Sequence, residues 1–388
     1  MRVLREPTSP FHEQNVAQIA AELAESFGWG VRSDASGNLM IERQDHAEHF
    51  DPSEPGLLLT AHMDHPGFWA RRMVDRRTLE ASWVGRVPRS YFEGAAVRFV
   101  TGGSPAPPVW MAGSRPGQAR DYRCGGQPVS GTITEVLRYV GEGERALVRV
   151  QVDQDVAPGS IGQWALPGPE VIDGRLYAPA IDDLAGVAAL LCVMGELGRD
   201  RCPVRPVRFL LTRAEEAGFV GCLGHCREHS ASGSRRHDQV VGVEMSMATT
   251  VATPGAGPVI RVGDRRSVFD PAVTAGLARV AQRLEADEPG FRYQRRLMPG
   301  GTCESTVFQA YWGRTGAVCL AMDHYHNVNT HTRTLDRESI DVGDFVGLVK
   351  LLASVARSPE AEPDGDGVDD WLEDLWRRQS PLLEQSSA

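Results

Sequence analysis

Two adjacent acidic residues constrain this chain more than any other feature of its sequence. Asp182 and Asp183 follow the apolar segment 177–181 and lead directly into an Ala/Val/Leu-rich helical pattern. One carboxylate could cap the N-terminus of that helix, where unpaired N–H groups and the helix dipole favour negative charge. A cap does not explain the second carboxylate, because two acids at the end of a buried strand are costly unless cations or a metal share the charge. The pair therefore predicts that other parts of the chain supply partners.

The order of the predicted elements indicates an α/β fold. A first helix is predicted from Ser9, a favourable N-cap before Pro10, to Phe27. The apolar run 57–61 is typical of a strand buried on both faces. Strands and helices alternate again after Asp182, and a last helix is predicted over 342–356. This order predicts a doubly wound mixed sheet that holds its ligands at the carboxyl ends of its strands.

The pattern differs between about residues 84 and 174. Short alternating stretches such as 148–152 are separated there by Gly/Pro-rich segments, including 101–126. Such a pattern is typical of a small β-barrel. The sequence thus predicts a discontinuous α/β domain over 1–83 and 175–356, with a β-barrel inserted over 84–174. The acidic tail, 357–388, is predicted to be flexible or a loosely docked helix.

Composition excludes several classes of protein. The chain has 388 residues and a formal net charge of −10, so it lacks the basic balance of a nucleic-acid-binding protein. No apolar run approaches the roughly 18–20 residues that span a bilayer, and the N-terminal residues lack the apolar segment of a secretory signal. The seven cysteines are scattered and odd in number, which fits reduced thiols. We therefore expect a cytoplasmic protein without nucleic-acid or membrane partners.

Side chains that bind metals follow several predicted strands. His62 and Asp64 come directly after the run 57–61 and lie two residues apart, so they face the same way in an extended chain. An acid beside a histidine commonly fixes the ring direction of a metal-bound imidazole. A surface hydrogen bond is the alternative for this pair when it is taken alone.

Further acids stand at the ends of two more predicted strands. Glu215 and Glu216 follow the strand that ends at Thr212. They could be acids at a helix N-terminus, whereas in a metal site one would ligate and the other would take a proton from water. Glu244 ends the apolar strand 240–243, where a lone carboxylate is expensive to bury.

A last candidate ligand is His326, which follows the predicted strand 317–320. His324 and His331 lie close by in the sequence, so the identity of the ligand in this segment stays open.

The order His-x-Asp, Asp-Asp, Glu-Glu, Glu, His is more specific than any of its members. Because it contains this series of motifs, the chain resembles the co-catalytic di-metal aminopeptidases, and among them the tetrahedral (glutamyl/leucyl) aminopeptidase family. Four segments carry the resemblance, namely 61–64, 180–186, 214–218 and 300–302. The inserted β module fits as well, so the resemblance extends to about residue 356.

The resemblance implies a site with two divalent metal ions per subunit. Asp182 would bridge them; His62 and Glu244 would hold one metal, and Glu216 and His326 the other. Glu215 would be the general base and Asp64 would orient His62. The resemblance also implies a cis peptide bond between Asp182 and Asp183. Mixed nitrogen and oxygen ligands suit Zn²⁺ first, with Co²⁺ or Mn²⁺ as alternatives.

Five positions depart from the pattern of that family. His65-Pro66 replaces Glu-Val, Cys303 replaces Asp, Asn327 replaces Ser, and Glu244 replaces the more usual Asp. The metal set is intact, so these departures bear on the substrate rather than on the type of reaction.

The resulting hypothesis is a metal-dependent exopeptidase that hydrolyses peptide bonds with metal-activated water and forms a homo-oligomer through the inserted module. One alternative is an amidase or deacylase that acts on a small acylated metabolite. Another is a non-catalytic structural protein, but such a protein has no need for a base at Glu215.

Two other groups of residues have weaker alternative interpretations. Cys222 and Cys226, with His225 and His229, could form a zinc site, but their spacing favours one apolar helix with thiols as small hydrophobic groups. Cys303 could be a nucleophile, but no separate His–acid pair is evident for it.

Overall fold

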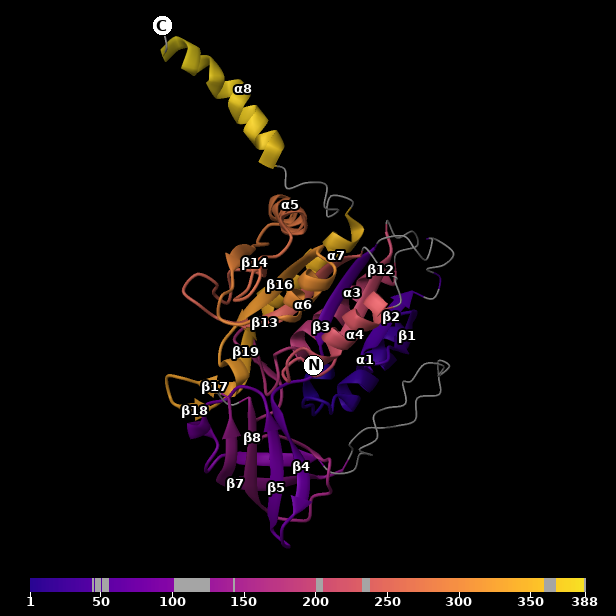
Figure 1. Ribbon diagram of the computed structural model, residues 1–388, viewed down its shortest axis with the longest axis vertical. Coiled ribbons are helices and arrows are strands. Elements are labelled where there is room, and N and C mark those ends of the chain that lie inside the picture. Colours follow the sequence, from indigo (N-terminus) through magenta and orange to yellow (C-terminus); the bar gives the residue numbers. More distant parts are fainter. Residues whose placement is uncertain are drawn as a thin grey trace.

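A large α/β body and a small β-barrel make up the molecule, with the barrel at one end of the body (Figure 1). The computed structural model describes residues 1–43, 45, 50, 56–100, 126–141, 144–199, 205–231, 238–358 and 368–386. Most of the Gly/Pro-rich segment noted in the sequence, residues 101–125, lies outside the described residues.

An eight-stranded mixed sheet forms the centre of the body, in the order β1-β2-β12-β3-β13-β16-β14-β15. Its strands are β1 (Trp29–Ser33), β2 (Leu39–Arg43), β12 (Val207–Thr212), β3 (Leu57–His62), β13 (Gln239–Met247), β16 (Thr315–Met322), β14 (Val259–Gly263) and β15 (Gln294–Leu297). The four central strands β12, β3, β13 and β16 are parallel. Every residue of β3, β12 and β16 is buried, as their apolar runs predict. The carboxyl ends of these strands therefore meet at one edge.

Helices cover both faces of this sheet. One face packs against α1 (Gln14–Ser26), α3 (Leu184–Leu197), α5 (Pro271–Asp287) and α7 (Val342–Arg357). The other face packs against α4 (Val220–Ala231) and α6 (Glu304–Tyr311). Phe308 of α6 and Leu210 of β12 belong to the apolar layer between these helices and the sheet. The predicted doubly wound fold is confirmed.

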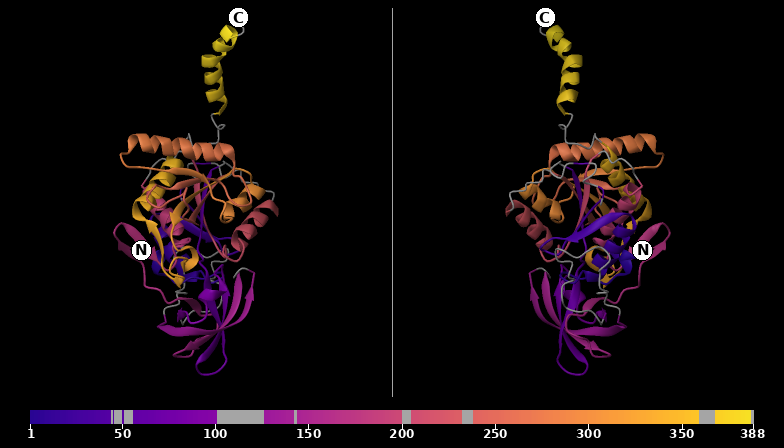
Figure 2. Two further views of the ribbon diagram at one scale, coloured as in Figure 1. Left: turned by 90° about the vertical axis from the view of Figure 1, so that its left-hand side faces the viewer. Right: turned by 90° about the vertical axis from the view of Figure 1, so that its right-hand side faces the viewer.

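The predicted inserted barrel is also confirmed. Six described strands close it in the order β4-β5-β8-β7-β6-β9. They are β4 (Gly67–Met73), β5 (Thr78–Val84), β8 (Arg145–Val152), β7 (Pro128–Val140), β6 (Ala96–Val100) and β9 (Ile161–Trp164). Aromatic rings such as Phe68, Trp83 and Trp164 fill its interior, and Figure 2 shows it as a unit beneath the body. Strand β4 and all of β5 except its last residue lie before residue 84, because the chain passes from β3 into the barrel with only four residues between.

A small antiparallel sheet lies beside the carboxyl edge of the large one. Its order is β10 (Glu170–Ile172), β11 (Arg175–Ala178) and β19 (Glu338–Asp341). β11 leads into the Asp182 segment, and β19 leads into α7. A two-stranded sheet of β17 (Val328–Asn329) and β18 (Thr334–Leu335) follows the turn η3 (Tyr325–Asn327).

One terminal segment differs in detail from the sequence-based expectation, and the other contains a helix, which is one of the two alternatives expected for it. α1 begins at Gln14 rather than at Ser9, because Phe11 has a left-handed φ of 69° that interrupts a helix. The tail contains the helix α8 (Val368–Ser386), which exposes Trp371 and Trp376. Within the described part of the chain, no helix has both the length and the apolar composition to cross a bilayer.

Candidate metal centre and active site

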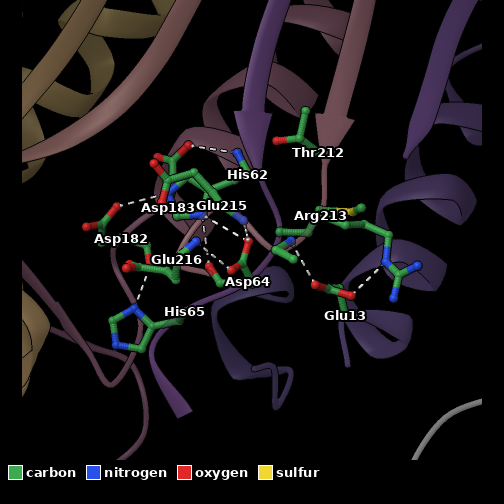
Figure 3. Close-up of polar contacts among 12 residues, drawn as sticks. Glu13, His62, Asp64, His65, Asp182, Asp183, Thr212, Arg213, Glu215 and Glu216 are labelled. Atoms are coloured by element: carbon green, nitrogen blue, oxygen red, sulfur yellow. Dashed lines mark hydrogen bonds and ion pairs between the residues drawn. The ribbon is translucent and has the colours of Figure 1, made fainter. Parts of the chain in front are cut away.

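The strand ends bring His62 and the acidic pair together at the edge of the sheet. β3 ends at His62, whose Nε2 lies 3.3 Å from Oδ1 of Asp182 (Figure 3). The backbone N–H of His62 donates to Asp183 Oδ2 at 3.2 Å. The Asp182–Asp183 peptide bond is cis, as the resemblance implies. The two adjacent acids thus contact different groups of the same residue.

Asp64 lies behind His62 and is fully buried. Its Oδ1 is 3.5 Å from His62 Nδ1, and its backbone carbonyl is 3.1 Å from the same nitrogen. Its two carboxylate oxygens also accept from the backbone N–H groups of Glu215 at 2.9 Å and Glu216 at 3.0 Å. Asp64 therefore fixes both the imidazole of His62 and the loop that carries the paired glutamates.

His326 is the histidine of its segment that reaches this cluster. Its Nε2 lies 3.0 Å from Glu216 Oε1 and 3.8 Å from Asp182 Oδ2. Its Nδ1 is 3.0 Å from the carbonyl oxygen of Arg86, at the edge of the barrel. His324 instead places its Nδ1 2.9 Å from the carbonyl of Arg337, and His331 is exposed.

Glu244 enters the same site from β13. The sequence placed it at the end of its strand, but β13 continues to Met247 because it pairs with β16 over that length. Its carboxylate joins His62 and Asp182 in one group of candidate ligand atoms within 4.8 Å of one another. Asp182, Glu216 and His326 form a second such group, and Asp182 is common to these two. A third group consists of His62, Glu215 and Glu216.

The electrostatics of the cluster reflect an excess of carboxylates. Burial, together with the charges of Glu244 and Glu216, raises the pKa of Glu215 well above its usual range despite the nearby His62. Burial likewise raises the pKa of Glu244 to about 8, with Asp182 adding to it. For His326 burial opposes protonation, yet the neighbouring Glu216 and Asp182 carboxylates raise its pKa to about 9. A site of this kind attracts cations strongly.

The unsatisfied atoms of the cluster fit a metal. Asp182 Oδ1 and His326 Nε2 are buried and form no hydrogen bond of acceptable geometry with the described residues. Their neighbours in the chain are other candidate ligands, His62 Nε2 at 3.3 Å from Asp182 Oδ1 and Glu216 Oε1 at 3.0 Å from His326 Nε2. Buried polar atoms almost always have partners, and a cation held among these atoms would satisfy both. Imidazole nitrogens and carboxylate oxygens are the ligands of Zn²⁺ and similar divalent ions.

The sequence did not point to Glu338, which lies beneath the cluster on β19. One carboxylate oxygen of this fully buried residue accepts from the N–H groups of Ile181 at 2.7 Å and Asp182 at 3.0 Å. The other accepts from His326 N–H at 2.8 Å. Glu338 thus ties together the two segments that meet at Asp182 and His326. No local pattern marks this residue, since it stands in a four-residue strand without a recognisable motif.

Two of the residues that differ from the family pattern, His65 and Asn327, contact each other. His65 Nδ1 lies 2.5 Å from the carbonyl oxygen of Asp182, and His65 Nε2 lies 3.2 Å from Oδ1 of Asn327. The amide of Asn327 donates to the carbonyl of Pro179 at 2.8 Å. The pair therefore buttresses the backbone on both sides of the segment 179–182.

The weaker alternatives do not fit the structure. Cys222 and Cys226 are buried in the apolar layer beside α6, as small hydrophobic groups would be. Cys303 is also buried, and burial raises the pKa of its thiol, which keeps it protonated. A protonated buried thiol is a poor nucleophile.

The fold and this cluster together define a metal-dependent peptidase. The family model described as M42 glutamyl aminopeptidase matches residues 37–341. The chain belongs to this family, and it is a metal-dependent aminopeptidase. The resemblance inferred from the sequence motifs is thereby confirmed.

Individual relatives are distant in sequence but similar in fold. A putative aminopeptidase of Acetivibrio thermocellus is 24% identical over 335 residues, covering 83% of this chain and 86% of that protein. An aminopeptidase of the archaeon Desulfurococcus kamchatkensis is 19% identical with a TM-score of 0.70, covering 93% and 94% of the two chains. The TET1 peptidase of Pyrococcus horikoshii is 18% identical with a TM-score of 0.69, covering 92% and 97%.

Proposed function

We propose that the site holds two divalent cations and that Asp182 bridges them. His62 and Glu244 complete the ligands of one cation, and Glu216 and His326 those of the other. The observation that carries this proposal is that Asp182 belongs to two of the three groups of closely spaced ligand atoms, one with His62 and Glu244 and one with Glu216 and His326. Its unsatisfied Oδ1 supports a role for both carboxylate oxygens.

Zn²⁺ is the proposed metal, with Co²⁺ or Mn²⁺ as alternatives, because the donor set contains nitrogen and oxygen but no sulfur. When bound, such a pair of cations supplies activation of water and polarisation of a scissile carbonyl.

The residues of the chain divide the remaining tasks. Glu215 is the proposed general base; it takes a proton from the attacking water and delivers a proton to the leaving amine. The hydrogen bond from its backbone N–H to Asp64, at 2.9 Å, supports a fixed position for this residue. Asp64 is a positioning residue, since it contacts His62 and the Glu215–Glu216 backbone. The proposed substrate is a peptide with a free amino terminus.

The test is a release assay with metal-loaded protein. Aminoacyl-anilides and dipeptides are compared with N-acetylated peptides and acylated amino acids, and Glu215→Gln is the matched variant. We expect cleavage of the free-amine substrates alone. Loss of a general base lowers kcat by about 10²–10⁴-fold, so Glu215→Gln should fall within this range while it retains its metal, as measured by elemental analysis.

Other outcomes of the assay are equally informative. Cleavage of only acylated compounds would move the protein to the amidase or deacylase alternative. Full activity of Glu215→Gln would contradict the assigned base. Two bound metals without hydrolysis of any substrate would favour the non-catalytic alternative.

We also propose that the chain forms a homo-oligomer through its barrel. The P. horikoshii TET1 peptidase assembles into a tetrahedron or an octahedral shell, and the likeness of the folds supports a similar use of this one. A monomeric mass in multi-angle light scattering would refute the proposal.

We propose a cytoplasmic location because the thiols of the described residues are not joined in disulfides. The described cysteines Cys192, Cys222, Cys226, Cys303 and Cys319 are all free, as is usual in reducing compartments. Recovery of the native protein in a secreted or periplasmic fraction would contradict it.

A further inference from the structure

The N-terminal segment 8–13 lies against two of the loops that carry candidate site residues. Thr8 Oγ1 donates to the carbonyl of Met63 at 2.8 Å, in the loop that follows β3. Glu13 contacts the loop that follows β12 and carries the paired glutamates. These contacts join parts of the chain that are 55 and 201 positions apart. The start of the chain therefore belongs to the surroundings of the site.

The side chain of Glu13 is turned away from its own helix. Glu13 directly precedes α1, where an acidic side chain commonly caps the free N–H groups of the first turn, but it makes no such hydrogen bond. Its Oε1 accepts instead from the N–H groups of Phe11 at 2.7 Å and Ala214 at 3.0 Å. Its Oε2 accepts from Nε of Arg213 at 2.7 Å. Because Glu13 is only 1% exposed, these charge-assisted contacts fix its position.

Arg213 ties the same loop to the N-terminal segment a second time. Its Nη2 donates to the carbonyl of Phe11 at 3.0 Å, and its backbone N–H donates to Oδ1 of Asn38 at 3.0 Å. Glu13 and Arg213 lie to the right of the candidate metal ligands in Figure 3. The loop is thus held at its first residue through both side chain and backbone.

The next residue of the loop, Ala214, has an unfavourable backbone conformation. Its φ is 51°, a left-handed value that is uncommon for a residue with a Cβ atom. Such conformations persist only where the surrounding contacts determine them. The N–H of Ala214 is held by Glu13, and the following two N–H groups are held by Asp64. Two buried carboxylates therefore fix three successive donors, and one of these carboxylates comes from the N-terminal segment.

We propose that Glu13 is a positioning residue for the hydrolysis, which holds the general base Glu215 in place through the backbone of Ala214. This rests on the proposed function, because the loop governs the rate only if Glu215 is the base. A displacement of about 1 Å in a catalytic arrangement can cost roughly 10²-fold in rate. Glu13 would thus make the rate of the reaction depend on the fold of the N-terminal segment.

The first test is Glu13→Ala, assayed with an aminoacyl-anilide and saturating Zn²⁺. We expect kcat to fall by about 10–100-fold, the usual effect of groups that orient a site. KM should stay within a few fold of the wild-type value, because loss of an interaction needed only in the transition state lowers kcat and kcat/KM together.

The matched control is Asp238→Ala. Asp238 is 2% exposed, and its Oδ1 accepts from the N–H of Gly56 at 2.8 Å and from Nη1 of Arg208 at 3.0 Å. The partners are of the same kinds as those of Glu13, but they lie at the amino ends of the central strands. This variant should lose stability and keep its kcat. A loss of kcat as large as in Glu13→Ala would overturn the inference, since removal of any buried carboxylate would then have that effect.

Glu13→Asp and Glu13→Gln separate the contact from the charge, and they decide the question if Glu13→Ala does not fold. Aspartate keeps the charge but is one methylene too short to reach the N–H of Ala214 from the same backbone position. Glutamine keeps the length, and its amide oxygen can still accept from Phe11 and Ala214. We expect Glu13→Gln to retain more of the wild-type kcat than Glu13→Asp. The reverse order would overturn the inference, because the charge of Glu13 rather than its contact with the loop would then matter.

Hydrogen exchange of the metal-loaded protein separates failure of this inference from failure of the proposed function. Local loosening of a loop speeds exchange of its amides, so residues 214–216 should exchange faster in Glu13→Ala, or in Glu13→Asp, than in the wild type and in Asp238→Ala. Mass spectrometry of the corresponding peptides measures the difference. Unchanged exchange, or faster exchange with an unchanged kcat, would overturn the inference alone. A wild type that hydrolyses no substrate would overturn the proposed function, and the exchange measurement would still decide whether Glu13 holds the loop.

Discussion

The carboxylate of Asp64 lies behind the candidate metal site and contacts both a histidine side chain and the backbone of a loop. It is close to the imidazole of His62, and it accepts from two successive backbone N–H groups at Glu215 and Glu216. The sequence suggested only the first of these contacts, through the His-x-Asp spacing. The second becomes visible only when β3 and β12 lie side by side, because the two segments are about 150 positions apart.

Asp64→Asn tests this double role at the scale of one residue. The amide oxygen still accepts from one backbone N–H of the glutamate loop, but the NH2 group that replaces the other oxygen faces the second donor. Because groups that orient metal ligands are usually worth about 10–100-fold, we expect a loss of this size in metal affinity and in kcat/KM. Calorimetric metal titration and the anilide assay measure the two quantities.

The matched control is Asp75→Asn. Asp75 also accepts from two backbone N–H groups, those of Arg77 and Thr78, but it does so in an exposed turn of the barrel. A loss of metal affinity in this control as large as that in Asp64→Asn would mean that the contacts of Asp64 with the site are not responsible.

Residue types at strand ends made much of the candidate site predictable. Each of His62, Asp182 and Glu216 stands beyond an apolar run or before a helical one. Glu338 could not be assigned in this way, since its importance comes from contacts across the fold.

At the scale of elements, the short strand β19 stabilises the site through a single side chain. Glu338 accepts from three backbone N–H groups that belong to the segments before α3 and within η3. It thereby holds the backbone of Asp182 and His326 at a fixed separation. A glutamine at this position would present an amide nitrogen to at least one of these donors.

We therefore expect Glu338→Gln to lower both stability and metal affinity. An unsatisfied buried group costs about 1–3 kcal/mol, which a denaturant titration of the metal-free protein can measure. Asp344→Asn is the control, because Asp344 also accepts from two backbone N–H groups, at Gly255 and Gly257, and is not among the candidate ligands. It should lose stability only; an equal loss of metal affinity would contradict the role assigned to Glu338.

Element boundaries were less predictable than element types. The helix predicted from Ser9 begins at Gln14, and β13 extends past Glu244, in both cases because a tertiary arrangement overrides a local signal. The division between body and barrel also lies earlier than the change in sequence pattern, since β4 and β5 belong to the barrel. Pairing partners define a strand, and a single sequence does not contain them.

At the scale of the whole molecule, the site joins the two parts of the chain. The carbonyl of Arg86, at the barrel edge, faces the imidazole of His326. Bound cations would also neutralise the carboxylates gathered from β12, β13 and the Asp182 segment. Metal should therefore stabilise the entire body rather than a single loop.

Removal of metal by a chelator should lower the melting temperature, and Zn²⁺ should restore it. Binding at a thousandfold excess over the dissociation constant is worth about 4 kcal/mol, which for a chain of this size corresponds to a shift of roughly 5 °C or more. Scanning calorimetry measures the shift. Melting temperatures unaffected by chelator and by added Zn²⁺ would show that the carboxylate cluster is stable without a cation.

The most direct test of the two-metal centre is the number of ions bound per chain. Wild-type protein and Asp182→Ala are loaded with Zn²⁺, desalted and measured by elemental analysis against protein concentration. Because Asp182 is shared by both groups of ligands, two ions per chain are expected for the wild type and fewer than one for the variant. One ion in the wild type, or two ions retained in a folded Asp182→Ala protein, would contradict the bridged centre.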